Sequence, residues 1–153
     1  MGTRSTTKFI AKRGEKLTPL VNIYQQFDGY IDGVGHDLAN FLKNKKIING
    51  ISSGQDNSNY ANGLGCLIAQ YIKEFKKEVG NLYITDFEDK EEYNYEVIFD
   101  EGKYFDMGFG ERDGLSTDEL IIIKVDSCPN FEGTPSELLK FEEGEEDEDY
   151  TIT

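Results

Sequence analysis

Histidine and cysteine are scarce in this chain, which has one histidine and two cysteines in 153 residues. A structural zinc site uses about four Cys or His ligands, and a catalytic site about three. The composition therefore excludes a conventional zinc centre, and we expect neither a metal nor another cofactor. Cys66 and Cys128 form no CxxC pair. Without a secretion signal we expect both thiols to be reduced, as in the cytoplasm.

Long apolar runs and a surplus of basic residues are missing as well. No stretch reaches the roughly 18 apolar residues of a membrane-spanning helix, and the N-terminus lacks the apolar core of a signal peptide. The 16 Lys and Arg residues are outnumbered by 30 Asp and Glu residues, so the net charge is −14. Proteins that bind nucleic acids or anionic membranes unaided need a basic excess. We therefore expect no direct nucleic-acid binding, no membrane binding and a cytoplasmic location.

The first half of the chain predicts a hairpin followed by two helices. Residues 3–12 and 20–27 are β-prone segments joined by a turn. A first helix is expected near 36–46. Apolar residues recur at three- and four-residue steps over 64–79, which predicts a second helix with Gly80 as its terminating residue.

The second half predicts strands. Residues 82–85 and 93–99 are expected strands, and 103–107 is expected to add a short one. The apolar run 120–125 suits a central strand. In the strand 93–99, one face is apolar, whereas the other is mixed and carries Asn94, Glu96 and Ile98.

These elements predict an α+β domain. Thr134 and Glu137 form a capping box with Pro135 at the first helical position, which predicts a short C-terminal helix. Strands and helices do not alternate regularly, so we expect a mainly antiparallel sheet, made of the N-terminal hairpin and three or four later strands. Two helices pack on one face of that sheet. A single domain over 1–141 is followed by an acidic tail over 142–153.

Charge is divided unequally along the chain. Residues 1–85 carry 7 acidic and 11 basic side chains, whereas 86–153 carry 23 acidic and 5 basic ones. The tail is either a solubilising segment or a contact arm for a basic surface, and its candidate contact residues are Glu142, Glu143, Glu145, Glu146, Asp147, Glu148 and Asp149. Because opposite charges attract, the division also favours a homo-oligomer that salt weakens, or binding to a basic protein surface.

Two glycine-rich bends are candidate ligand sites because each opens an expected helix. Helix N-termini present unpaired N–H groups and a partial positive charge, and glycines let a ligand approach the backbone. Neither bend matches the P-loop or dinucleotide pattern. If the two helix starts share one cleft, a small nucleotide-like anion could bind at Gly33, Gly35, His36, Asn62, Gly63 and Gly65. The alternatives are that the glycines serve only their turns and that His36 is a structural residue instead of a general base.

Several segments together resemble a family of small uncharacterised proteins from phages, bacteria and large DNA viruses. The segments are Gly2-Thr3-Arg4-Ser5, Tyr24 to Tyr30 (YQQFDGY), Asn49-Gly50-Ile51, Asn62 to Gln70 (NGLGCLIAQ) and Phe131 to Leu138 (FEGTPSEL). The resemblance spans about 140 residues and implies an intact single domain without an established activity. In that family an Arg often stands at the place of Gln25 and Gly-His-Gly at the place of Gly33-Val34-Gly35. This chain lacks both, so chemistry by such residues is not expected here.

The sequence thus favours a non-catalytic binding or interaction module. No paired catalytic motif is present. The resemblance suggests a viral or phage accessory or assembly protein that acts through protein contacts or a small anionic ligand, in the host cytoplasm or the virion. One alternative is an enzyme that acts on a nucleotide or a phosphorylated small molecule. Another is a structural component of a virion.

Overall fold

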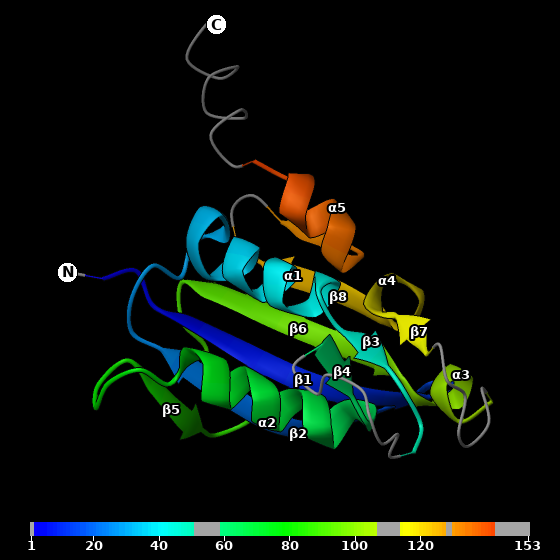
Figure 1. Cartoon of the computed structure of the whole chain (residues 1–153). Helices are drawn as coiled ribbons and strands as arrows, with labels where there is room; N and C mark the ends of the chain where they lie inside the picture. The colour runs from blue at the N-terminus through cyan, green and yellow to red at the C-terminus, as the bar shows by residue number, and fades with distance from the viewer. Residues whose placement is uncertain (1, 51–58, 107–113, 128–129, 143–153) are drawn as a thin grey trace, which may run out of the picture.

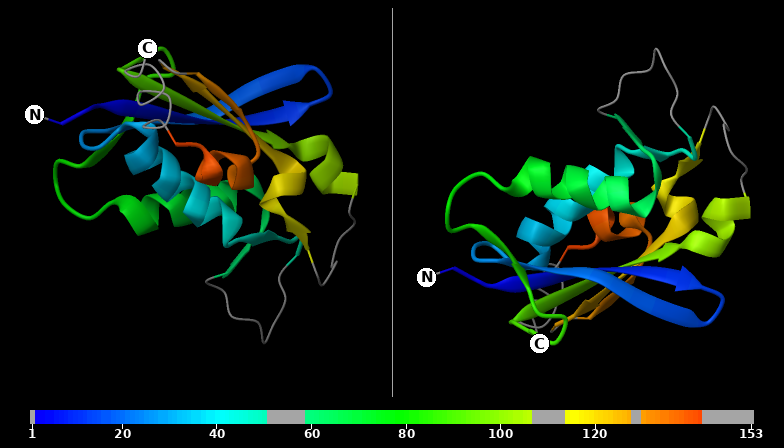
Figure 2. Two further views of the ribbon diagram at one scale, coloured as in Figure 1. Left: turned by 90° about the horizontal axis from the view of Figure 1, so that it is seen from above. Right: turned by 90° about the horizontal axis from the view of Figure 1, so that it is seen from below.

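A six-stranded sheet with helices on one side forms the frame of the computed structural model, which describes residues 2–50, 59–106, 114–127 and 130–142 (Figures 1 and 2). The strands are β1 (Ser5–Arg13), β2 (Lys16–Gln25), β5 (Leu82–Thr85), β6 (Tyr93–Asp100), β8 (Ile121–Asp126) and β9 (Phe131–Gly133). The helical segments are the π-helical turn η1 (Ile31–Gly35), α1 (His36–Lys43), α2 (Gly63–Phe75), α3 (Glu101–Asp106), α4 (Thr117–Leu120) and α5 (Pro135–Lys140). The expected α+β class and N-terminal hairpin are confirmed.

The order of the strands across the sheet is β5-β2-β1-β6-β8-β9. β1 runs parallel to β6, whereas the other four neighbouring pairs are antiparallel. The sheet is therefore mixed, and the expectation of a mainly antiparallel sheet holds for these four pairs. Between β2 and β6 the chain forms two helices and adds β5 to the hairpin before it crosses to the other side of β1. A long connection of this kind is what allows two strands to pair in parallel.

Helices α1 and α2 lie on the same face of the sheet and run in opposite directions (Figure 1). A second, three-stranded sheet joins them, with β3 (Lys46–Ile47) between β4 (Tyr60–Ala61) and β7 (Leu115–Ser116). β3 directly follows α1, β4 directly precedes α2, and the two strands pair with each other. The end of α1 therefore lies next to the start of α2.

The second helix is shorter than its apolar pattern predicts. It ends at Phe75, five residues before Gly80, and Val79 is 91% exposed instead of packing inward. The Asn81 side chain donates to the Phe75 carbonyl oxygen at 2.7 Å, and the Lys76 ammonium donates to the carbonyls of Val79 and Leu82. The Asn81 bond satisfies the carbonyl of the last helical residue, which the helix itself leaves unpaired. The Lys76 bonds hold the turn that follows the helix.

The segment after β6 is a helix, α3, and the short strand expected at 103–107 is wrong. The Asp100 side chain caps the start of α3. Its Oδ1 atom accepts the Lys103 N–H at 3.1 Å. Tyr104 then packs edge-on against Phe99. The short helix α5 begins as expected, because Thr134 and Glu137 form both bonds of the capping box.

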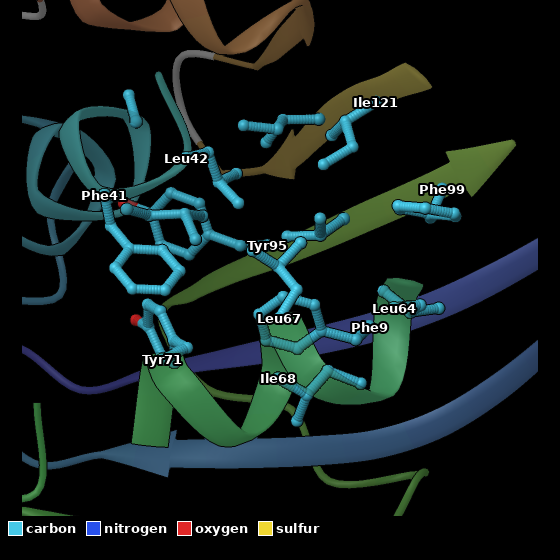
Figure 3. Close-up of a cluster of buried hydrophobic side chains, with 14 of the residues drawn as sticks. Phe9, Phe41, Leu42, Leu64, Leu67, Ile68, Tyr71, Tyr95, Phe99 and Ile121 are labelled. Carbon is cyan, nitrogen blue, oxygen red and sulfur yellow. The ribbon is translucent and has the colours of Figure 1, made fainter. Parts of the chain in front are cut away.

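The hydrophobic core lies between the sheet and helices α1 and α2 (Figure 3). Alternate residues of the strands point into it, including Phe9, Tyr95 and Phe99, which are fully buried. From the helices, Leu42, Leu67 and Tyr71 point toward them. The Tyr71 ring meets the rings of Phe9 and Phe41 at centroid distances of 5.5 and 5.4 Å. Aromatic pairs in this edge-to-face arrangement add to the stabilisation from burial alone.

The described part of the chain ends just beyond the core. Phe141 packs against Phe131, and Glu142 is exposed. The remaining candidate contact residues of the tail, Glu143, Glu145, Glu146, Asp147, Glu148 and Asp149, lie outside the described residues. Among the helices that the structure describes, none has the length and apolar character needed to cross a membrane.

Candidate functional site

The bend before α1 packs closely on itself and on the sheet. Asp28 adopts a left-handed φ of 57°, and its carbonyl oxygen accepts the Val34 N–H at 2.8 Å. A Cβ atom added to Gly33 would collide with that oxygen, and one added to Gly35 would lie 3.1 Å from Tyr95 Oη. Both glycines therefore allow the protein's own atoms to approach, which is the turn role that the sequence left open.

His36 lies inside a continuous helical segment, because the π-helical turn η1 precedes α1 without a break. The first helical residue is Ile31, so the helical segment begins one turn earlier than expected, and the N–H groups of Gly33 and Val34 are bonded to the Tyr30 and Asp28 carbonyls. The His36 Nε2 atom lies 2.7 Å from the carbonyl oxygen of Phe141. A carbonyl only accepts, so Nε2 carries the proton and donates. This bond joins α1 to the end of α5 and supports the structural interpretation of His36.

Carboxylates dominate the electrostatics of the first bend. Asp28 accepts a hydrogen bond from Tyr30 Oη at 3.2 Å, and this bond, together with the Asp28 charge, raises the pKa of the tyrosine. Partial burial and the charge of Asp28 raise the pKa of Asp37, whereas His36 lowers it. Negative charge already crowds the start of this helix, so the bend is a poor site for an anion.

The bend before α2 is also occupied by side chains of the protein. Asn62 Oδ1 accepts the Gly50 N–H at 2.9 Å, and Tyr104 Oη donates to the Ile48 carbonyl oxygen at 3.0 Å. Gly63 has a φ of +88°, and a Cβ atom there would lie 3.0 Å from Tyr104 Oη. Gly65 differs, because a Cβ atom on it would have nothing within 4 Å.

The two bends do not form one cleft. β3 and β4 place the start of α2 beside the end of α1, so the starts of the two helices lie at opposite ends of the pair (Figure 1). The shared site expected from Gly33, Gly35 and His36 with Asn62, Gly63 and Gly65 is therefore wrong in its geometry. The sequence could not show this, because helix periodicity carries no information about the relative direction of two helices.

A different surface brings polar and apolar side chains together. We call it the open face: the side of the six-stranded sheet opposite α1 and α2, where Figure 2 shows no helix of the described residues. Strand alternation and the pairing register assign to it Thr6, Lys8, Ile10 and Lys12 of β1, Asn94, Glu96, Ile98 and Asp100 of β6, Ile122, Lys124 and Asp126 of β8, and Glu132 of β9.

Four charged residues cross the open face in a single line. Lys8 pairs in register with Glu96, Glu96 with Lys124, and Lys124 with Glu132. We call this line the charge row; its signs alternate from β1 to β9. Within the described residues, the ion pairs closer than 4 Å are Arg4–Glu91 and Arg13–Glu101. The four charges of the row are thus neighbours that do not close into ion pairs with one another.

Apolar residues form a line next to the charge row, two residues away along each strand on the same face. Ile10 pairs with Ile98, and Ile98 pairs with Ile122. Ile10 and Ile98 are covered by their neighbours, but Ile122 is 38% exposed, and Leu17 at the end of the same face is 51% exposed. A hollow of about 300 Å³ lies here and includes Leu17, Ile98 and Ile122 in its lining.

A larger hollow of about 440 Å³ includes all four residues of the charge row in its lining and extends to the other side of the row. Thr6, Asn94 and Asp126 contribute to its floor, and the Thr6 hydroxyl donates to Asn94 Oδ1 at 2.6 Å. Asp89 and Lys90, from the loop between β5 and β6, form part of its wall. That loop is anchored on the sheet by Asn22, whose side chain donates to the carbonyls of Asp86 and Asp89. The open face is therefore hollowed on both sides of one charged line.

Sequence reasoning found one strand of this surface and missed the rest. The mixed second face of 93–99 indicated that Asn94, Glu96 and Ile98 share a side. The charge row also needs the parallel register of β1 with β6, which sets Lys8 against Glu96. No local signal carries that register, because it depends on how the long connection returns to the hairpin.

Comparisons with known proteins identify no relative for this chain. No family model, curated protein or solved structure matches it significantly. The resemblance to small phage, bacterial and viral proteins therefore stays a prediction.

Proposed function

We propose that this protein is a non-catalytic interaction module that works through protein contacts made by the open face of its sheet. The observation that carries the proposal is the charge row beside exposed Ile122. Among the described residues, these four charges have no ion-pair partner, and they adjoin an apolar line on a face that no described helix covers. Sheet faces that need no partner tend to carry polar residues throughout.

The character of the open face supports a protein as its partner. Its Lys residues are 8, 12 and 124, and its acidic residues are Glu96, Asp100, Asp126 and Glu132, so the signs nearly balance. A protein surface that binds a nucleic acid or an anionic membrane carries predominantly positive charge. A mixed line of charges beside an apolar strip is the pattern of a protein interface, where charge order sets the register and apolar contacts supply affinity.

The nucleotide alternative has less support from the same structure. Its candidate residues lie at two separated bends, and carboxylates crowd one of them. Asn62 and Gly63 are engaged with Gly50 and Tyr104.

The test compares Ile122→Asp with Val79→Asp, which adds the same charge at an exposed apolar position away from the open face. Tagged wild-type protein and both variants are purified from producing cells, and bound proteins, including untagged copies of this chain, are quantified by mass spectrometry. We expect the Val79 variant to retain what the wild type binds and the Ile122 variant to lose at least about tenfold in affinity.

Melting curves provide the folding control. A bound protein retained equally by wild type and the Ile122 variant, with both folded, would refute the proposal. If the Ile122 variant melts early, Lys124→Glu replaces it, because that side chain is exposed and its substitution leaves the core intact.

A further inference from the structure

The order of charges on the open face points to its occupant. We infer that a second copy of this chain packs against the open face, about a twofold axis that lies between β6 and β8 and runs parallel to the strands. The inference rests on the proposed function, since it names the partner of the same surface.

The charge row is complementary to itself under this operation. A twofold axis between β6 and β8 exchanges β6 with β8 and β1 with β9 in the opposed copy, because the strands are evenly spaced by about 4.8 Å. Glu96 then faces Lys124 of the second copy, and Lys8 faces Glu132 of the second copy. By symmetry each contact occurs twice, so every charge in the two rows has an opposite charge across the interface.

The charge row also excludes a second twofold arrangement of the two faces. An axis that runs along the row, across the strands, would bring each residue onto its own copy. Lys8 would meet Lys8, Glu96 would meet Glu96, and like charges placed opposite each other are strongly unfavourable. Of these two arrangements, the sign order selects the one in which the strands of the two sheets run in nearly the same direction, as in aligned β-sandwiches.

The apolar line and the hollows fit the same arrangement. The exchange of β6 and β8 places Ile122 of one copy over Ile98 of the other, and Ile98 lines the hollow of about 300 Å³. The loop between β5 and β6 is anchored on β2, which lies outside the four strands of the charge row. Its residues Asp89 and Lys90 line the larger hollow together with Lys8, and the axis sets this wall opposite the β9 side of the second copy.

A pair of single substitutions tests the axis directly. Glu96→Lys gives a row with lysine at both of the central positions, and Lys124→Glu gives a row with glutamate at both. Each variant alone would set like charges against each other twice in its homodimer. In an equimolar mixture, the two central lysines of the Glu96→Lys chain instead face the two central glutamates of the Lys124→Glu chain, so both contacts regain opposite charges.

Sedimentation velocity and native mass spectrometry at about 0.15 M salt are the measurements, because that salt screens repulsion between the net charges beyond about 8 Å. We expect the wild type to dimerise, each single variant to lose at least about tenfold in association, and the mixture to form heterodimers. The control mixture is Lys77→Glu with Glu78→Lys, an exposed pair after α2 with the same charge changes. Each of these control variants should dimerise like the wild type, without preference for the heterodimer.

Three results would overturn the inference: a wild type that stays monomeric up to about 1 mM, a protein concentration typical of weak association, single variants that dimerise like the wild type, or a mixture that does not recover. None of these touches the proposed function, which fails only if the Ile122 variant keeps the proteins that the wild type binds.

Discussion

The two faces of the six-stranded sheet are formed by the same strands, whose successive residues point to opposite faces. On β8, Ile121, Ile123 and Val125 are buried under the helices, whereas Ile122 and Lys124 lie on the open face between them. The covered face is predominantly apolar and packs against the helical layer. The open face combines an apolar line with a line of opposite charges. The comparison teaches that one face is suited to permanent burial within this chain and the other to contact that also requires correct charge order.

The largest expected difference between the faces comes from one substitution made on each. Ile123→Ala removes a fully buried side chain and should cost about 2–5 kcal/mol of unfolding free energy. Ile122→Ala removes the same atoms from the open face and should cost less than about 1 kcal/mol in the monomer. Denaturant unfolding of the two variants measures both values. Equal losses would mean that the open face is buried in the folded monomer, contrary to the structure.

Glycines sharpen the comparison between packed and open positions. Gly33→Ala would place a Cβ atom against the Asp28 carbonyl and should cost about 1–3 kcal/mol. Gly65→Ala adds a Cβ atom to α2 in open space and should gain about 0.5–1 kcal/mol, because alanine favours a helix over glycine. Thermal melting of both variants tests this pair. Tolerance of Gly33→Ala would show that the first bend has room for a ligand after all.

The smallest expected effect concerns the charge of Asp37 on the helical side. Burial and the nearby Asp28 raise the pKa of Asp37 above its usual range. Between the usual and the raised value the folded protein binds more protons than the unfolded chain, so stability falls as pH rises through that window. Because the Asp37 residue is exposed and water screens its charge, the effect on stability is small, and Asp37→Asn should gain about 0.5 kcal/mol or less at pH 7.

The gain from Asp37→Asn should disappear when the pH falls below the usual carboxyl range, near pH 3, because the carboxyl group is then neutral in both states. Melting temperatures of wild type and variant across this range provide the measurement. A gain that stays constant with pH would mean that the charge of Asp37 is not its cause.

Local patterns in the sequence were informative where one element decides its own structure. Alternation over 93–99 predicted β6 and identified its two faces, and the capping box at Thr134 placed the start of α5. Helix periodicity located α2 but misplaced its end. The Asn81 side chain bonds to the carbonyl of Phe75, where the helix ends, and such a bond is invisible to an apolar repeat.

The candidate site depended on contacts between distant segments. The glycines and His36 looked like ligand residues because each stands at an expected helix start. In the structure Gly35 meets Tyr95, and His36 meets Phe141, from elements far away in the sequence. A free helix end cannot be told from an occupied one until those neighbours are placed.

The sequence by itself determined the class of the fold, the hairpin, the helices that cover the sheet and the apolar side of the strand 93–99, because these follow from the two-residue and 3.6-residue periods of local structure. Tertiary structure alone decided that β1 and β6 pair in parallel, that α1 and α2 start at opposite ends, and that Lys8, Glu96, Lys124 and Glu132 form one row. The physical reason is that strand register and helix direction depend on the closure of long loops, whose free energy varies only slowly with loop length.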